Sequence, residues 1–177
     1  HGGESGMKIA LLQCNSVTGD VAGNMERILD DVRQAAAAGA ELCVTPELAL
    51  CGVAPGHYLC ADDFAAGCRK ALDHMAEVLK DGPALLVGTP VPSVYASGLL
   101  SNAAVLVHKG AWQVASRKVY QGGQGGTQGA GSDGEDSRYF DKGISCGILT
   151  LGGWRMGVVL CEDAQREEDA FWKTRYA

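Results

Sequence analysis

Residues 155–164, RMGVVLCEDA, decide how the rest of the chain is interpreted. The stretch is typical of a short apolar strand that ends on Cys161 and is followed at once by Glu162 and Asp163. A strand that delivers a cysteine at its tip is a rigid support for a nucleophile, and free backbone N–H groups in a following turn favour both thiolate and oxyanion. The alternative is that Cys161 is a small buried apolar residue, which is the more frequent fate of a cysteine.

The length and charge of the chain bound its function. A chain of 177 residues suits one domain with a real core, and a net charge of −6 without a basic cluster argues against nucleic acid or an anionic membrane as partner. No apolar run approaches the roughly 20 residues that span a bilayer, and no signal peptide is predicted. Residues 1–6 are interpreted as the end of an expression tag, so we expect the domain to span residues 7–177. We expect this domain to be cytoplasmic.

The cysteines indicate a reducing compartment. There are seven of them, which is an odd number, and none forms a CxxC pair. Several lie inside apolar runs. This pattern is typical of neither a disulfide framework nor a zinc site, and it favours a cytosolic protein without a metal.

The first part of the chain predicts a β–α–β unit. Residues 7–13 are expected to form a buried strand, and an amphipathic helix capped by Asn24 is expected to follow and to end at Gly39. Residues 41–45 are expected to form a second strand, which Pro46 stops. A unit of this size favours parallel, right-handed pairing.

The later elements follow from the same periodicities. We expect a helix over residues 63–80, a strand over 84–89, and two hairpins over 102–119 and 144–160 that turn at glycines. Residues 121–134, rich in Gly, Gln and Ser, are predicted to be a mobile loop rather than a phosphate-binding loop.

Three polar residues stand at predicted strand ends. Glu47 follows the second strand, Lys118 lies near the end of a hairpin strand, and Cys161 ends the last strand. A carboxylate there can act as general base, and a lysine beside it would stabilise both the carboxylate and a developing oxyanion. The competing interpretation is that Glu47 and Lys118 are ordinary solvated residues.

Together these segments resemble the nitrilase, or carbon–nitrogen hydrolase, superfamily and its Glu-Lys-Cys triad. The matching segments are residues 45–52 (TPELALCG), Lys118 and residues 159–163 (VLCED). Within the superfamily the chain is most similar to the glutaminase domains of glutamine-dependent NAD synthetases, which also carry the Arg-Tyr-Phe found at residues 138–140. The resemblance covers residues 7 to about 165. It implies an α/β fold, the nitrilase-type α-β-β-α sandwich.

The sequence departs from that pattern near the presumed substrate site. The family usually continues Lys-x-x-Leu-Pro-Asn-Tyr, whereas Lys118 is followed by Val-Tyr-Gln-Gly. The family's second glutamate falls on Asp136, with Glu135 beside it, and the aromatic residue usual after Cys-Glu-Asp-x is Gln165. These differences leave the acyl-transfer chemistry plausible and put glutamine specificity in question.

The resemblance implies that Glu47, Lys118 and Cys161 hydrolyse an amide, with glutamine favoured, through a thioester and without metal or organic cofactor. It implies that Asp136 or Glu135 positions Lys118 or water. Glu162 would meet the substrate ammonium, or it only caps the following helix. An ATP-dependent synthetase domain or subunit that receives the ammonia, and a homo-oligomer, are the partners implied.

Two other functions stay open, and both relate to the length of the chain. One is a stand-alone amidase acting on another small linear amide. The other is a catalytically incomplete scaffold or interaction module. Because the chain ends soon after Cys161, we expect a sandwich that lacks part of its C-terminal half. A sheet without that half would expose apolar faces and unpaired strand edges.

Overall fold

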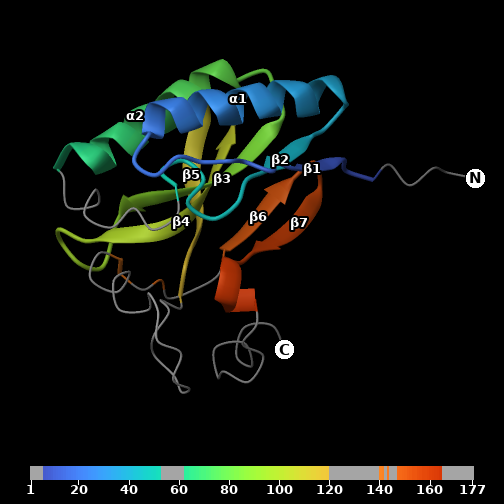
Figure 1. Ribbon diagram of the computed structural model, residues 1–177. Coiled ribbons are helices and arrows are strands. Elements are labelled where there is room, and N and C mark those ends of the chain that lie inside the picture. The colour runs from blue at the N-terminus through green and yellow to red at the C-terminus, as the bar shows by residue number, and fades with distance from the viewer. Residues whose placement is uncertain (1–5, 53–61, 120–139, 142, 144–146, 165–177) are drawn as a thin grey trace, which may run out of the picture.

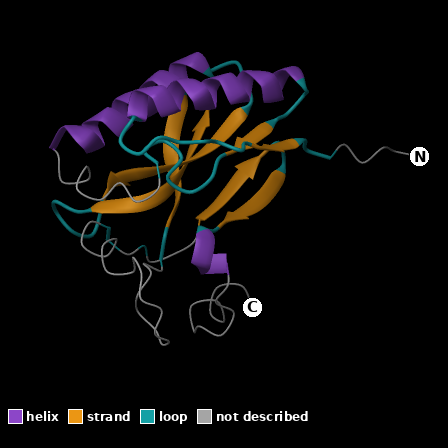
Figure 2. Cartoon of the chain, viewed as in Figure 1, coloured by secondary structure: helices purple, strands orange, loops and turns teal. Residues whose placement is uncertain are grey.

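The computed structural model describes residues 6–52, 62–119, 140–141, 143 and 147–164, and arranges them in three layers (Figures 1 and 2). Two helices cover one face of a five-stranded sheet, and a two-stranded hairpin packs on the other face. In chain order the elements are β1 (Ile9–Leu11), α1 (Val21–Ala37), β2 (Leu42–Val44), α2 (Asp62–Val78), β3 (Ala84–Pro92), β4 (Leu100–His108), β5 (Ala111–Arg117), β6 (Gly147–Leu151), β7 (Trp154–Val158) and the 3₁₀ helix η2 (Cys161–Ala164).

The five-stranded sheet follows chain order, from β1 to β5. Strands β1, β2 and β3 are parallel, as the β–α–β prediction requires, and β4 and β5 continue the sheet antiparallel. The prediction of a buried first strand was wrong. Ile9 is 48% exposed and Leu11 is 71% exposed, because β1 is an edge strand and only Ala10 turns toward the helix-side core.

Helix α1 begins at a different cap from the one predicted. Asp20, not Asn24, is the N-cap, and its carboxylate accepts a hydrogen bond from Gly23 N at 2.9 Å. Asn24 lies in the first turn, where it is buried and bonds both the N–H and the C=O of Val17. The helix ends at Ala37, and Gly39 follows with a φ of 84°, which agrees with the predicted stop.

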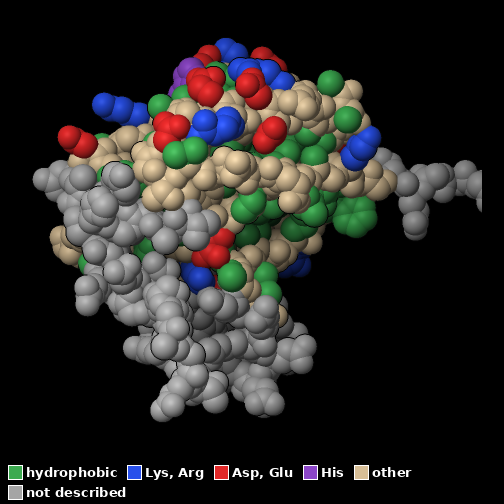
Figure 3. Space-filling view, in the orientation of Figure 1, with side chains coloured by type: hydrophobic (Ala, Val, Ile, Leu, Met, Phe, Trp, Pro, Cys, Tyr) green, Lys and Arg blue, Asp and Glu red, His purple; other side chains and the backbone are tan. Residues whose placement is uncertain are grey.

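The main core lies between the helices and the sheet. The periodicity of the predicted 63–80 helix puts five apolar residues on its inner face, and all five are buried: Phe64, Cys68, Leu72 and Met75 on α2, and Leu79 directly after it. Ile28, Leu29 and Val32 of α1 join them over the sheet. The opposite sides of the helices are polar, and Figure 3 shows charged side chains of both signs gathered over them. Periodicity alone therefore predicted this interface correctly.

Both predicted hairpins form. Strands β4 and β5 turn at Lys109 and Gly110, whose φ values of 50° and 78° are those of a type I′ turn. Strands β6 and β7 turn at Gly152 and Gly153, both also with positive φ. The 121–134 segment lies outside the described residues.

The β6–β7 hairpin covers part of the sheet face that the helices leave free. Its residues Leu149 and Val158 pack on Ala104, and Leu151 and Met156 lie over Leu106 and its neighbours. Strand β6 thereby runs beside the end of β5, where Gly147 comes so close to Ala115 that no side chain would fit. None of the helices in the described part of the chain is long and apolar enough to cross a bilayer.

Candidate active site

Glu47 lies in a tight turn whose two ends are hydrogen-bonded to strand β3. After β2, the N–H of Thr45 donates to Leu86 O at 3.0 Å, and the N–H of Leu50 donates to Gly88 O at 3.0 Å. A Cβ on Gly88 would come within 2.5 Å of Pro46 O and 2.6 Å of Leu48 N. Glycine at this position therefore lets the turn lie directly on the sheet, which fixes the backbone that carries the Glu47 carboxylate.

The carboxylate of Glu47 receives two donors on the same oxygen. Lys118 Nζ lies 2.9 Å from Glu47 Oε1, and Asn102 Nδ2 lies 2.6 Å from it. Within the part of the chain that the structure describes, Glu47 Oε2 accepts no hydrogen bond. The carboxylate is thus held through one oxygen, and 28% of the Glu47 side chain is exposed.

Lys118 is a buried lysine, with 8% of its side chain exposed. Burial of an ammonium group is costly unless it is paired, and here Glu47 supplies the counter-charge. The backbone of Lys118 is fixed as well: its N–H donates to Asn102 O and its C=O accepts from Gly143 N, each at 2.8 Å. The interpretation of Lys118 as an ordinary surface lysine is therefore wrong.

A β-bulge turns Lys118 to the correct side of the sheet. Trp112 and Val114 of β5 face the helix-side core, so strict alternation would send residue 118 to the same side. The pairing slips between Ala104 and Val105, which gives β5 one extra residue. As a result Lys118 shares the hairpin-side face with Asn102, and a bulge next to a functional residue is a recurrent device for aiming a side chain.

Cys161 begins η2, and Val159 and Leu160 separate it from the end of β7. Val158 and Leu160 are buried in the cluster that joins the hairpin to the sheet, whereas Cys161 is exposed and has a positive φ of 45°. Such a φ is uncommon for a residue with a side chain and marks a backbone held by its surroundings. The prediction that Cys161 leaves the apolar strand at its tip agrees with this geometry, and the buried-cysteine alternative does not.

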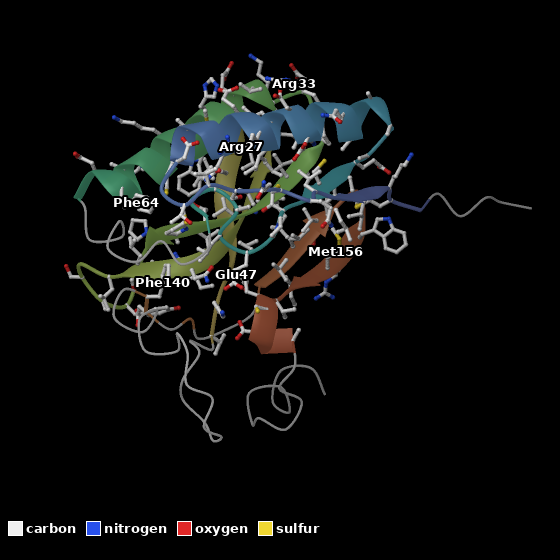
Figure 4. All side chains as sticks on the ribbon, viewed as in Figure 1. Arg27, Arg33, Glu47, Phe64, Phe140 and Met156 are labelled. Atoms are coloured by element: carbon white, nitrogen blue, oxygen red, sulfur yellow. The ribbon has the colours of Figure 1, made fainter. Side chains whose placement is uncertain are left out.

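Asp163 ties the Cys161 turn to the strand that carries Lys118. Its carboxylate is buried, with the residue 1% exposed, and Asp163 Oδ2 accepts a hydrogen bond from Val119 N at 2.9 Å. The N–H of Asp163 also bonds Leu160 O at 3.0 Å, which closes the turn. In Figure 4, Glu47 lies at the edge of the sheet on the side where β7 leads into η2. Hydrogen bonds thus link the Glu47 turn to Lys118, and the segment of Lys118 to the turn that begins at Cys161.

The structure separates Cys161 from the other described cysteines. Burial raises the pKa of the Cys68 thiol to about 11, and it raises the pKa of the Cys51 thiol even further. Burial also raises the pKa of Cys14 and Cys43. These four thiols are poor nucleophiles near neutral pH, because the thiolate is the reactive form.

The side chains of the other predicted site residues lie outside the described part of the structure. Glu135 and Asp136 lie outside the described residues, and so does the side chain of Glu162, whose backbone belongs to η2. Within the described residues there is no group of three or more His, Cys, Asp or Glu side chains that could hold a metal ion.

Sequence reasoning gave no role to Asn102 or Asp163. A signal for Asn102 exists, because Ser101 and Asn102 are the polar residues at the start of an otherwise apolar strand. Asn102 must point its amide NH₂ at Glu47, since a carboxylate only accepts, and its Oδ1 is then buried without a partner among the described residues. A polar group buried at this cost, in contact with the carboxylate, is a positioning residue for Glu47.

Comparison with known proteins identifies the class to which this fold belongs. The family model for carbon–nitrogen hydrolases matches residues 8–172, so the chain belongs to that family. The resemblance seen in the motifs is confirmed. The family assignment supports a hydrolase that acts on carbon–nitrogen bonds.

The individual relatives are longer than this chain, which spans only part of each. The chain is 33% identical to a glutamine-dependent NAD(+) synthetase of Synechocystis, over 95% of this chain and 29% of the relative. A solved amidase from Nesterenkonia sp. has a TM-score of 0.75 at 26% identity, with 90% of this chain and 57% of the amidase covered. A solved glutamine-dependent NAD+ synthetase from Acinetobacter baumannii has a TM-score of 0.76 at 24% identity, with 90% and 28% covered. The chain therefore corresponds to part of the nitrilase fold, which confirms the predicted fold class.

Proposed function

We propose that this chain releases ammonia from the side-chain amide of glutamine, with Cys161 as nucleophile, Glu47 as general base and Lys118 as oxyanion-stabilising cation. The observation that carries the proposal is the buried Lys118 ammonium paired with Glu47 at 2.9 Å, on a segment that is hydrogen-bonded to the turn of an exposed cysteine through Val119 and Asp163. In a family of hydrolases, such a buried ion pair is better explained by catalysis than by stability, to which such pairs contribute little.

In the first half of the reaction Glu47 takes the proton of the Cys161 thiol, and the thiolate attacks the amide carbonyl carbon. A C–S bond forms, and the carbonyl oxygen becomes an oxyanion. Lys118 Nζ and the backbone N–H that follows Cys161 stabilise it, a role worth on the order of 10²–10³ in rate per donor. Glu47 then returns the proton to the amide nitrogen, the C–N bond breaks, and ammonia leaves a thioester on Cys161.

In the second half Glu47 removes a proton from water, and the resulting hydroxide attacks the thioester carbonyl. The C–S bond breaks, the acid product leaves, and the proton returns to Cys161. The net reaction consumes one amide and one water and yields one carboxylic acid and one ammonia. Asn102 positions Glu47 throughout, because it binds the same oxygen as Lys118. Glu135, Asp136 and Glu162 stay proposed substrate-positioning residues.

Glutamine is favoured as substrate by the similarity to glutamine-dependent NAD(+) synthetases, of which the Synechocystis protein is 33% identical. On this proposal the ammonia passes to an ATP-dependent synthetase domain or subunit, in a cytoplasmic homo-oligomer. The free thiols among the described cysteines support the cytoplasm. The second candidate is an amidase for a small linear amide, favoured by the likeness to the Nesterenkonia amidase and by the absence of the Leu-Pro-Asn-Tyr motif after Lys118.

The test is ammonia release by wild type, by Cys161→Ala and by Cys14→Ala as a matched control at a half-buried cysteine. We expect Cys161→Ala to abolish release and Cys14→Ala to preserve it. Comparing kcat/KM for glutamine with that for propionamide separates the two candidates. A higher value for propionamide replaces glutaminase by amidase, and undiminished hydrolysis by Cys161→Ala contradicts the mechanism itself.

A further inference from the structure

A pocket of about 280 Å³ lies between α2 and the helix-covered face of the sheet. Its apolar wall includes Leu72 from the helix, Val91 from β3, and Trp112 and Val114 from β5. Ligand pockets are typically about 300–1,000 Å³, so this one suits a small molecule. It is separate from the Glu47 site, because the bulge in β5 sends Arg117 and Lys118 to opposite faces of the sheet.

The charge of the pocket is entirely positive. Arg69 of α2 and Arg117 of β5 line it, and among the residues that the structure describes no acidic side chain does. Neither guanidinium forms an ion pair with any described residue, although the protein as a whole has a net charge of −6. Arg117 Nε is buried and has no acceptor among the described residues, so this N–H donor is left without a hydrogen bond there. Arg69 is exposed and lies on the solvent side.

Trp112 offers a fixed aromatic surface in the same pocket. Its Nε1 donates to Asp73 Oδ1 at 2.7 Å, a bond that joins β5 to α2 across the neighbouring surface. The polar edge of the indole is therefore already satisfied, and the Asp73 carboxylate is engaged by it. The ring itself remains available for stacking against a flat ligand.

We propose that this pocket binds a small organic carboxylate with a flat apolar body. A carboxylate matches the planar fork of a guanidinium with two parallel hydrogen bonds, and Arg117 supplies one with Arg69 beside it. The body of the ligand lies against Trp112, Val91 and Leu72. Such a ligand contacts the residue that precedes Lys118, but it occupies the face of the sheet away from the reacting groups.

The experiment is isothermal titration calorimetry of the full chain with benzoate and phenylacetate as probes. Benzyl alcohol serves as the uncharged analogue and inorganic phosphate as the anion without an apolar body. We expect saturable binding of at least one carboxylate in the millimolar range or tighter, and about tenfold or greater weakening in Arg117→Gln. Arg69→Gln and Trp112→Phe should weaken binding less. Arg155→Gln, at an exposed arginine of β7, is the charge-matched control and should bind as wild type does.

Three results would overturn the proposal: no saturable binding of either carboxylate, equal binding of benzyl alcohol or phosphate, or equal loss in Arg155→Gln. Because Arg117 precedes Lys118, each variant is first compared with wild type by circular dichroism and thermal unfolding. If Arg117→Gln unfolds, Arg69→Gln and Trp112→Phe decide the matter, since unchanged affinity in both rules the site out.

Discussion

The two faces of the five-stranded sheet are covered very differently. On the helix side a continuous core includes fully buried residues such as Met75, Leu85 and Val105. On the hairpin side two small clusters contain few buried residues, and Ile9 and Leu11 remain exposed. Glu47, Lys118 and the Cys161 turn all lie on this thinner side. The helix side thus supplies rigidity, and the hairpin side supplies access to polar groups that a thick core would seal.

The first prediction tests this division with one substitution on each face. Met75→Ala, in the fully buried helix side, should lower the free energy of unfolding by about 2–5 kcal/mol, because it leaves a cavity among well-packed neighbours. Leu149→Ala should cost less stability, since its cluster is smaller, but should lower kcat more, because β6 and β7 support Cys161. Urea unfolding and ammonia release measure the two effects. If the ratio of lost stability to lost activity were the same in both variants, the two faces would not differ in their contributions to rigidity and to the site.

The second prediction concerns the ion pair itself. Lys118→Met keeps much of the apolar stem but removes the ammonium, and kcat should fall on the order of 10²–10³ because one oxyanion donor is lost. Lys80→Met, at a lysine that pairs with Glu77 on the helix surface, is the matched control and should leave kcat nearly unchanged. A loss of activity equal in the two variants would mean that the buried pair has no special role.

The third prediction uses two strand glycines that differ only in their surroundings. Gly88→Ala places a Cβ against the backbone of the Glu47 turn, so stability should fall by about 1–3 kcal/mol and kcat should fall with it. Gly157→Ala, in β7, places a Cβ in open space, and stability should not fall. Thermal unfolding and ammonia release check both. An active, stable Gly88→Ala would show that the turn does not depend on close contact with β3.

The helix side was also the more predictable from sequence. The inward residues of α2 and the stop at Gly39 depend on local periodicity and backbone sterics, which the residues themselves report. The exposure of Ile9 depends instead on which strand lies at the edge, which long-range pairing decides. Asp20 and Asn24 are both capping residues four positions apart, and only the contacts of Asn24 with Val17 and Leu50 show which of the two is the cap.

The site was predictable as a set of residue types but not as a geometry. Glu47 and Cys161 are recognisable because each follows an apolar run, and Lys118 because it lies near the end of a predicted hairpin strand. The bulge that turns Lys118 toward Asn102 is a single extra residue in β5, and an alternating pattern does not reveal it. The contacts of Asn102 with Glu47, and of Asp163 with Val119, join residues that are 55 and 44 positions apart.

The fourth prediction compares thiols across the two faces. Iodoacetamide at neutral pH should modify Cys161 before Cys43, Cys51 or Cys68, because Cys161 is exposed and burial raises the pKa of the other three. Peptide mass mapping over time measures the order. Early modification of Cys68 would show that the helix-side core opens as readily as the hairpin side.

The raised pKa of Cys68 also gives a dependence of stability on pH. In the unfolded chain this thiol ionises near its ordinary value of 9.0, whereas in the folded protein it holds its proton up to about 11. Between these values the folded state binds more protons than the unfolded state, so the contribution is fully present below pH 9 and declines as the pH rises toward 11. Cys68→Ala removes the thiol at the cost of a small cavity, and its unfolding free energy should fall less steeply over this range than that of wild type. Parallel pH slopes for the two proteins would mean that the Cys68 thiol ionises with equal ease in the folded and unfolded chains.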